Sequence, residues 1–395
     1  MKSIRDFDLE NKKVIIRCDF NVPIKDEQII DDNRIQMSLE TIRYAVNHSA
    51  KVILMSHLGR IKTKDDLTKN SLEIVAHHLS TLLNRPVLFS KDTRGSLLES
   101  LVASLKCGDV LLVENTRYED LDGKRESNND EDLGKYWASL GDIFINDAFG
   151  VSHRSPASVV GIATYLPNGC GFLLEKEIKA MEALDEKAHP YVILLGGAKV
   201  SDKIGLISNL IQDVDKLLIG GGMAYTFLKA KGYEVGNSLV DEENIAFCQD
   251  MISKYSQKIC LPVDSVVTSS LTDTVSTVEK VGDFSYNVMG VDIGPDTVTL
   301  FEKVLENAKT VLWNGPMGVY ENENYAKGTV QILEYLTVNN IKTILGGGDT
   351  VAAASLYGYK DKVYHASTGG GAMLEYLEGK TLPGIEVLNL DKKEK

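Results

Sequence analysis

The stretch YVILLGGAK, residues 191–199, decides the predicted fold. Its first five residues are apolar, which is enough for a buried strand, and they run directly into a glycine pair. Strands that are apolar on both faces are typical of parallel sheets covered by helices. The stretch therefore predicts a strand followed by a turn and a helix, the repeating unit of an α/β protein.

The same pattern recurs on both sides of this stretch. Helical spacing separates the apolar runs, as in residues 33–50 and 71–84. We predict two doubly wound, Rossmann-like α/β domains with parallel sheets. The other predicted strands lie in VIIRCDF (14–20), KVILMSHL (51–58), DVLLVENT (109–116), DIFINDAF (142–149), KLLIGGG (216–222), KICLPVDSV (258–266), TVLWNGP (310–316) and TILGGG (343–348).

A break in the pattern predicts where one domain ends. A Pro/Asn/Gly cluster at 167–171 precedes a charged helical stretch and then His189 and Pro190. We expect an N-terminal domain over residues 1–170, an interdomain helix over 171–185 and a C-terminal domain over 186–379.

Composition excludes several classes of function. A formal net charge of −13 argues against non-specific binding to nucleic acid or to a membrane surface. The five cysteines are odd in number and form no C-x-x-C pair, and no stretch approaches the roughly 18–20 apolar residues that span a bilayer. We expect a reduced, cytoplasmic protein without a cysteine metal site.

Arginine is distributed unevenly, since all ten arginines lie within the first 154 residues. Arginine grips carboxylate or phosphate with a planar fork, whereas lysine acts as a movable point charge. A drift in composition could produce the same asymmetry, so the positions of the arginines must decide between the two explanations.

The predicted strand ends of the first half carry charged and amide side chains. Ligands of open α/β sheets bind beyond the carboxyl ends of the strands. We place Asp19 and Asn21 on the same side of the chain by strand alternation. Each residue alone could cap a turn or lie in the core, but the whole set favours a small, multiply anionic ligand. The set of residues comprises Asp19, Asn21, Arg34, His57, Arg60, Arg117, His153 and Arg154.

The predicted strand ends of the second half carry glycine and lysine. Glycines let the backbone approach a ligand, and helix N-termini suit phosphate; the alternative is that they only turn the chain tightly. In GGGDT, Asp349 either caps a helix or holds a Mg²⁺ ion that bridges to phosphate. Phosphoryl transfer needs mainly positioning and charge, so we interpret Arg34 and Lys199 as cations brought together from opposite domains.

With these motifs, the chain resembles the phosphoglycerate kinase family over nearly all of its 395 residues. The resemblance is carried, in order, by RCDFNVP, SHLGR, ENTRYE, NDAFGVSHR, LLGGAKVSDKIGLI, GGGMAYTFL, WNGPMGVYE, GGGDT and STGGGAMLEYLEGKTLPG. It implies reversible, Mg²⁺-dependent transfer of a phosphoryl group from 1,3-bisphosphoglycerate to ADP, giving 3-phosphoglycerate and ATP in glycolysis and gluconeogenesis. The sequence departs from the family at Ile61 and at Ser155-Pro156, which bears on the loop conformations there.

The resemblance also assigns roles to residues. Arg34 and Lys199 would act on the transferred group, Asp349 would bind the magnesium, and Ser367 and Thr368 would belong to a hinge. A cytoplasmic monomer is implied, with residues 380–395 returning to the first domain. The phosphoglycerate site would comprise Asp19, Asn21, Arg34, His57, Arg60, Arg117 and Arg154, and the nucleotide site Gly196, Gly197, Lys199, Lys203, Gly220, Gly221, Asn314, Pro316, Glu321, Gly347, Gly348, Asp349 and Thr350.

Two other functions are weighed against this one. Parallel sheets and glycine turns also suit an NAD-dependent dehydrogenase, but no G-x-G-x-x-G follows the first strand of either half. A non-catalytic nucleotide sensor would keep its ligand binding without Lys199.

Overall fold

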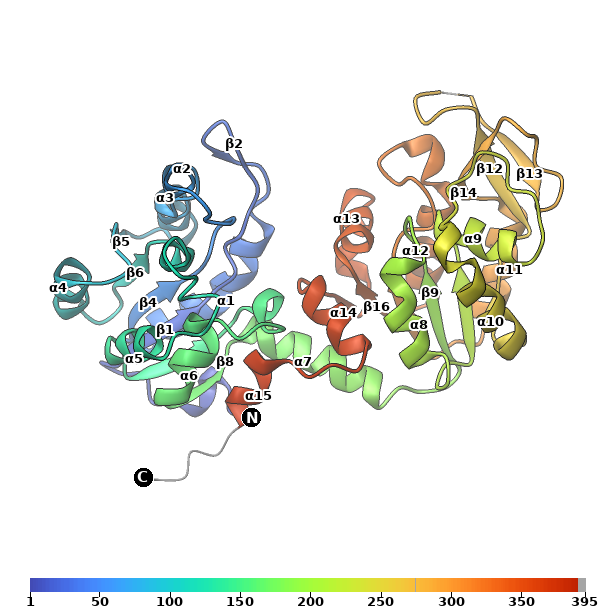
Figure 1. Cartoon of the computed structure of the whole chain (residues 1–395). Helices are drawn as coiled ribbons and strands as arrows, with labels where there is room; N and C mark the ends of the chain where they lie inside the picture. Colours follow the sequence, from blue (N-terminus) through green and yellow to red (C-terminus); the bar gives the residue numbers. More distant parts are fainter. Residues whose placement is uncertain (274, 390–395) are drawn as a thin grey trace. The chain divides into compact units, whose positions relative to one another are not determined.

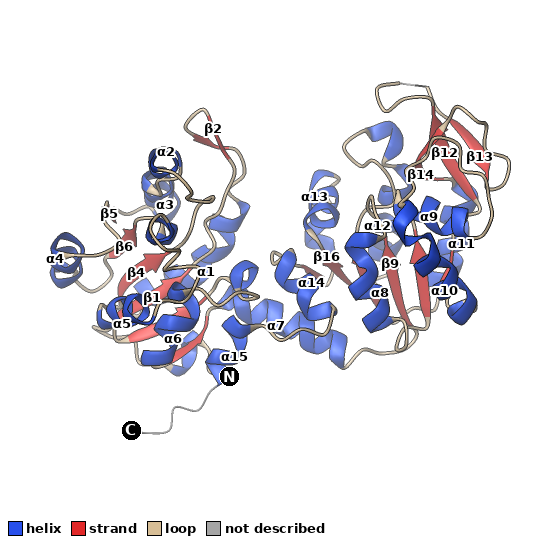
Figure 2. Cartoon of the chain, viewed as in Figure 1, coloured by secondary structure: helices blue, strands red, loops and turns tan. Residues whose placement is uncertain are grey.

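The computed structural model describes residues 1–273 and 275–389, and the chain forms two compact units. Unit 1 is Met1–Lys179 with the described residues from Thr381 onward, and unit 2 is Ala180–Lys380. Each unit holds a six-stranded parallel sheet with helices on both faces (Figures 1 and 2). The predicted fold class is confirmed. The predicted domain boundaries stay predictions; the two units divide within α7 (Phe172–Asp185).

The sheet of unit 1 has the strand order β5-β6-β4-β1-β7-β8. From β1 the chain passes through β4 to the edge strand β5 and returns to β6, which lies between them. From β7 it continues in the opposite direction to β8, so the strand order reverses between β1 and β7. The strands are β1 (Lys13–Arg17), β4 (Lys51–Met55), β5 (Val87–Ser90), β6 (Val110–Val113), β7 (Ile143–Asn146) and β8 (Asn168–Cys170). The helices are α1 (Asn33–Asn47), α2 (Lys64–Lys69), α3 (Glu73–Leu83), α4 (Ser96–Ser104), α5 (Glu131–Ser139), α6 (Ile162–Tyr165) and α15 (Pro383–Asn389).

The core of unit 1 follows from strand alternation. Val14 and Ile16 of β1 belong to a core cluster with Ile35 and Leu39 of α1 and Val75 of α3. The residue between them is equally buried, because the opposite face of the sheet is also covered. This is why the strands appear in the sequence as continuous apolar runs.

The sheet of unit 2 has the strand order β11-β10-β9-β15-β16-β17, which is the order of the Rossmann fold. The order reverses between β9 and β15, the position where such sheets bind ligands. The strands are β9 (Tyr191–Leu195), β10 (Lys216–Ile219), β11 (Ile259–Cys260), β15 (Thr310–Asn314), β16 (Lys342–Gly346) and β17 (His365–Ala366). The helices are α8 (Ile204–Leu210), α9 (Met223–Ala230), α10 (Ile245–Tyr255), α11 (Pro295–Leu305), α12 (Lys327–Val338), α13 (Gly348–Leu356) and α14 (Gly371–Leu377).

One predicted strand of unit 2 is wrong in its extent. The run at 258–266 is divided between β11 and β12 (Asp264–Thr268), which belong to different sheets. Pro262 lies between them, where a residue without an N–H cannot continue a ladder. β12 pairs with β13 (Thr277–Lys280) and β14 (Met289–Ile293) in an antiparallel sheet that we did not predict, and β2 (Ile24–Lys25) and β3 (Gln28–Ile29) form a hairpin in unit 1.

The chain returns to unit 1 near its end. The Gly384 N–H donates to the Ser152 carbonyl at 2.9 Å, and the Asn146 side chain donates to the Gly384 carbonyl at 3.0 Å. A Cβ at Gly384 would lie 2.8 Å from the Ser152 backbone, so only glycine allows this approach. Residues 390–395 of the predicted returning segment lie outside the described residues. Across the described ranges, no helix is both long enough and apolar enough to cross a bilayer.

Candidate active site

Asp19 and Arg34 form an ion pair at the carboxyl edge of the unit 1 sheet. Arg34 is the second residue of α1, and its Nη1 lies 2.8 Å from Asp19 Oδ2. β1 ends at Arg17, so the strand alternation that we predicted for Asp19 and Asn21 is wrong. They lie instead in a loop where the Asn21 N–H donates to Asp19 Oδ1 at 3.2 Å, a side-chain bond that shapes a turn.

Asn21 and Arg117 both bind the backbone of Gly59. The Gly59 N–H donates to Asn21 Oδ1 at 2.9 Å, and Arg117 Nη1 donates to the Gly59 carbonyl. Arg117 belongs to the 3₁₀ helix η2 (Thr116–Asp120), which follows β6. These bonds join the chain beyond β1, β4 and β6. An open cavity of about 550 Å³ has Asn21 and Gly59 in its lining.

His57 lies at the centre of a cluster of arginines. The residue follows β4 and is 4% exposed. Burial lowers its pKa well below the ordinary value, and the charges of Arg17, Arg117, Arg34 and Arg154 lower it further. A neutral imidazole therefore faces a concentrated positive field. In a chain of net charge −13, such a field at a sheet edge indicates an anionic ligand.

Arg60 and Arg154 are exposed residues at this edge. Arg154 Nε lies 3.1 Å from His153 Nε2, and the charge of Arg154 also lowers the pKa of Arg117, after burial and the charge of Arg17. Arg60 follows Gly59 directly, but no hydrogen bond or ion pair within the described part of the chain joins its side chain to the cluster. Its role stays a prediction.

Arg17 is the residue of this site that we missed. Its side chain is almost fully buried at the end of β1 and contacts His57. The sequence carried a signal for it, because a charged residue inside the apolar run VIIR costs free energy unless partners compensate it.

In unit 2, glycines bring the ends of three neighbouring strands into contact. Gly196 follows β9, and its N–H donates to the Asn314 carbonyl of β15 at 3.0 Å. A Cβ at Gly196 would lie 2.1 Å from the Pro316 carbonyl oxygen. Gly221 follows β10 with a φ of +62°, and a Cβ there would lie 2.7 Å from the Gly197 nitrogen. A side chain at either position would displace the backbone.

Above these glycines lies a cavity of about 510 Å³. Five predicted nucleotide residues line it: Gly197, Gly221, Pro316, Glu321 and Asp349. Its wall is otherwise largely apolar, since it also contains Leu239, Leu271, Met289, Val291 and Val319. We missed these five residues, which carry no signal in sequence that separates them from ordinary core residues.

The remaining predicted nucleotide residues are not part of the lining of this cavity. Lys203 Nζ donates to Asn314 Oδ1, and burial lowers the pKa of Lys203, although Asp202 and Asp349 raise it in part. Asn314 Nδ2 is buried and has no partner among the described residues. Thr350 Oγ1 accepts the Gly315 N–H at 2.6 Å. Gly220 is buried directly after β10, Gly347 is the N-cap of α13, and Gly348 is the first residue of that helix.

Lys199 has an exposed side chain and lies outside the lining of the cavity. Its positive charge contributes to a lowered pKa at Asp241, after the hydrogen bond from Asn244 and the bonds with Ser201. Lys199 therefore follows Ala198, which lines the cavity, but no hydrogen bond or ion pair among the described residues joins its side chain to the other predicted site residues.

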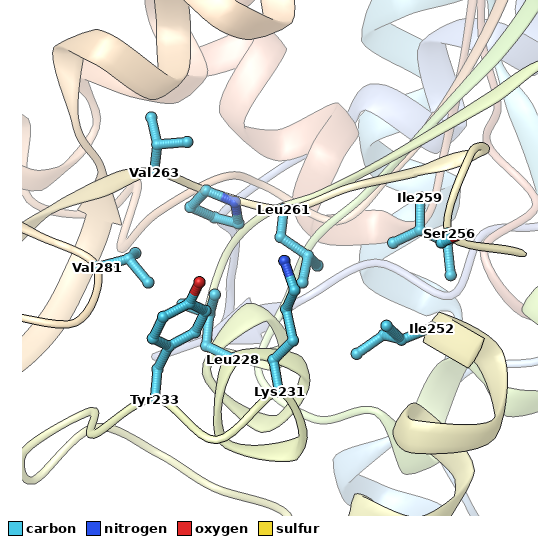
Figure 3. Close-up of a pocket in the computed structure, with 10 residues that line it drawn as sticks. Leu228, Lys231, Tyr233, Ile252, Ser256, Ile259, Leu261, Val263 and Val281 are labelled. Atoms are coloured by element: carbon cyan, nitrogen blue, oxygen red, sulfur yellow. The ribbon is translucent and has the colours of Figure 1, made fainter.

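A second hollow of unit 2, of about 270 Å³, contains none of the predicted residues. Figure 3 shows Lys231 between Tyr233 and Ile252, with Leu228 and Leu261 close by. The Lys231 ammonium lies 5.8 Å from the centre of the Tyr233 ring. This hollow lacks the glycine-rich strand ends of the larger cavity.

The comparisons with known proteins agree with this geometry. The family model for phosphoglycerate kinase matches residues 4–380. The phosphoglycerate kinases of Fusobacterium nucleatum and Enterococcus faecalis are each 54% identical to the chain, over 98% of its length and 99% of theirs. The chain belongs to the phosphoglycerate kinase family. The predicted family and the predicted phosphotransferase class are confirmed, and the dehydrogenase alternative is wrong.

Solved phosphoglycerate kinases share the fold. The structure from Coxiella burnetii has a TM-score of 0.88 at 39% identity, and that from Pyrococcus horikoshii OT3 has a TM-score of 0.87 at 32% identity. Each match covers 98% of both chains. The reaction of the family is the reversible transfer of a phosphoryl group from 1,3-bisphosphoglycerate to ADP in glycolysis and gluconeogenesis, so the predicted function is confirmed.

The close approach at Gly196 predicts a measurable cost. We expect Gly196→Ala to lower the free energy of unfolding of unit 2 by about 1–3 kcal/mol, because the methyl group displaces the backbone at Pro316. The chain has two tryptophans, Trp137 in unit 1 and Trp313 in unit 2. Urea unfolding followed by fluorescence in a Trp137→Phe background therefore reports on unit 2.

Gly348→Ala is the matched control, since a Cβ there meets nothing within 4 Å. It should leave the unfolding midpoint close to that of the parent. Equal stability of Gly196→Ala and the parent would contradict the close-approach argument.

Proposed function

We propose that the carboxyl edge of the unit 1 sheet binds the phosphoglycerate and that the carboxyl edge of the unit 2 sheet binds ADP or ATP. One observation carries this assignment: the two edges have complementary chemistry. Unit 1 presents arginines around His57, and unit 2 presents glycines beneath an apolar cavity. A small trianionic or tetra-anionic ligand suits the first edge, and a flat base with a phosphate tail suits the second.

At the first edge, arginine forks would bind the ligand's phosphate and carboxylate oxygens. Arg117 is already fixed by its bond to the Gly59 carbonyl, which limits the entropy lost on binding. Asp19 and Asn21 would meet the ligand's hydroxyl group. Arg34 keeps four further N–H donors beyond the one that contacts Asp19, so it can reach the transferred group while paired.

At the second edge, the apolar wall would hold the adenine ring, and the Glu321 carboxylate would accept hydrogen bonds from the ribose hydroxyls. Lys203 and the N-terminus of α13 would bind the phosphates. Asn314 Nδ2, which has no partner among the described residues, supports this, because its buried N–H donors suit a phosphate oxygen.

We propose Asp349 as the protein ligand of a Mg²⁺ ion. Asp349 is exposed in the first turn of α13 and lines the cavity. No group of three or more metal-binding side chains occurs in the part of the chain that the structure describes. This fits Mg²⁺, which commonly takes one or two carboxylates and completes its shell with phosphate oxygens and water. When bound, the ion neutralises negative charge on the nucleotide phosphates.

In the transfer itself, a phosphate oxygen of ADP attacks the acyl phosphate, and the carboxylate of 3-phosphoglycerate leaves. Arg34 and Lys199 would stabilise the negative charge on the transferred group. The reaction requires the two ligands to meet and water to be excluded, so we propose closure about a hinge that includes Ser367 and Thr368. We further propose a monomer that works in the cytoplasm.

The direct test is incubation with ATP, Mg²⁺, 3-phosphoglycerate and hydroxylamine, which traps the acyl phosphate as a hydroxamate. We expect product from the wild-type protein and a loss of turnover of at least about a hundredfold in Arg34→Ala and Lys199→Ala, since each removes a charge aimed at the transferred group. Arg43→Ala on α1 and Lys231→Ala in unit 2 are matched charge controls.

Each outcome bears on a stated role. Near-normal turnover of a folded Lys199→Ala or Arg34→Ala protein would contradict the role of that residue. No hydroxamate from a folded wild-type protein that binds nucleotide would favour the sensor alternative.

The magnesium assignment has its own test. Asp349→Asn removes the carboxylate charge, so the Mg²⁺ concentration for half-maximal activity should rise about tenfold or more. Calorimetric titration of ADP with and without Mg²⁺ should show that the ion no longer strengthens binding. Asp361→Asn, an exposed aspartate of the same unit, is the control. An unchanged Mg²⁺ dependence would leave Asp349 as a helix-capping residue.

A further inference from the structure

Arg17 connects the interior of unit 1 to His57. Arg17 is 1% exposed, and its guanidinium donates to three partners. Nη2 lies 3.2 Å from His57 Nδ1, Nε lies 2.8 Å from Ser158 Oγ, and Nη1 donates to the Cys18 carbonyl. One side chain thus bonds to the chain beyond β4 and to the segment around Ser158.

The hydrogen bond between Arg17 and His57 can have only one direction. A guanidinium carries donors and no acceptor, so Nδ1 of His57 must accept the bond. A nitrogen that accepts carries no proton, and the neutral ring then has its proton on Nε2.

The other side of Arg17 is fixed by a buried carboxylate. Ser158 Oγ accepts from Arg17 Nε, so its own proton is free to bond Glu126 Oε1, at 2.5 Å. The Ser158 N–H donates to Glu126 Oε2 at 2.9 Å. Glu126 is 2% exposed, and the charge of Arg17 opposes the rise in its pKa that burial causes. The two buried charges therefore compensate each other through Ser158.

The remaining nitrogen of His57 is open. Nε2 has no hydrogen-bond partner among the described residues. It is also not one of the fully buried side-chain atoms that lack a partner, so some of its surface is accessible. The small exposed part of His57 therefore includes Nε2. The ring lies in the field of Arg117, Arg34 and Arg154, which belong to the cluster that we propose as the phosphoglycerate site.

We propose that Arg17, held by Ser158 and Glu126, is a positioning residue that fixes the tautomer of His57, so that the ring offers its Nε2–H to an anionic oxygen of the phosphoglycerate. The proposal rests on the proposed function for its ligand. Arg17 does not touch the ligand; it acts through His57.

The charges around His57 support a ring that stays neutral. Arg17, Arg117, Arg34 and Arg154 all disfavour the imidazolium, as does burial. The unfolded chain takes up this proton near pH 6.5 and the folded protein does not, so His57 lowers the stability of the fold as the pH falls through 6.5. Because the ring stays neutral around pH 6.5, the Nε2–H group remains a donor there, and its hydrogen bond to the ligand does not change with pH.

The test reads the tautomer on the free protein by ¹⁵N NMR of the histidine side chains, with the His57 signal assigned by His57→Gln. We expect wild type to carry its proton on Nε2 from pH 5.5 to 8. Arg17→Lys keeps the charge but replaces the planar fork, whose Nε and Nη2 bond Ser158 and His57 separately, with a single nitrogen. Ser158→Ala removes the bridge to Glu126 with less risk to folding. Both should populate the Nδ1–H tautomer.

Kinetics give the second measurement. Both variants should raise the KM for 3-phosphoglycerate about tenfold, the loss of one hydrogen bond to a charged group, with the KM for ATP unchanged. Ser90→Ala is the control, because Ser90 is also fully buried and hydrogen-bonded, at 2.8 Å to the Asp92 carbonyl. It should change neither the tautomer nor the KM.

Three results would overturn the proposal: a wild-type proton on Nδ1, an unchanged tautomer in both variants, or a changed tautomer with an unchanged KM for 3-phosphoglycerate. Failure of the proposed function is distinguishable from these. It would appear as no binding of 3-phosphoglycerate to wild type, whereas the tautomer is measured without the ligand.

Discussion

Parallel strands end at the same edge of their sheet, and both sites depend on this constraint. In unit 1 it brings the residues after β1, β4 and β6 together, so that Asn21 and Arg117 can bind the same glycine. In unit 2 the ends of β9, β10 and β15 meet through glycine backbones. The chemistry of each edge then depends on which side chains follow the strands. One architecture, used twice, gives the edge that we propose as the anion site and the cavity that we propose for the nucleotide.

The two sheet edges differ more in their charge than in their backbone architecture. The first concentrates arginines around a neutral histidine in a chain that is strongly acidic overall. Such a field is costly without a ligand: burial lowers the pKa of Arg117 and of His57, and the neighbouring arginine charges lower both further. Binding a multiply charged anion relieves that repulsion. The second edge holds fewer charges, and it relies on backbone groups, Lys203 and an apolar wall.

Much of this was predictable from strand ends, and the exceptions have physical causes. The apolar runs and the glycine turns indicated the parallel sheets, because buried strands and close backbone contacts restrict residue type strongly. We did not predict the antiparallel sheet of β12, β13 and β14, because β13 is largely exposed and each of the three strands carries polar or glycine residues instead of a continuous apolar run. The sequence did not assign Arg17 to the site, because its role depends on Ser158 and Glu126, which are distant from it in sequence. The cavity wall of unit 2 likewise depends on tertiary packing.

The most direct measurement of the central claim is a pair of NMR titrations that follow backbone amides with each substrate alone. The account predicts that 3-phosphoglycerate perturbs Gly59 and Arg117 and leaves Gly197 and Gly221 unmoved, and that ADP with Mg²⁺ does the reverse. Perturbation of the unit 2 glycines by 3-phosphoglycerate alone, with Gly59 unmoved, would contradict the assignment of the two substrates to the two sheet edges.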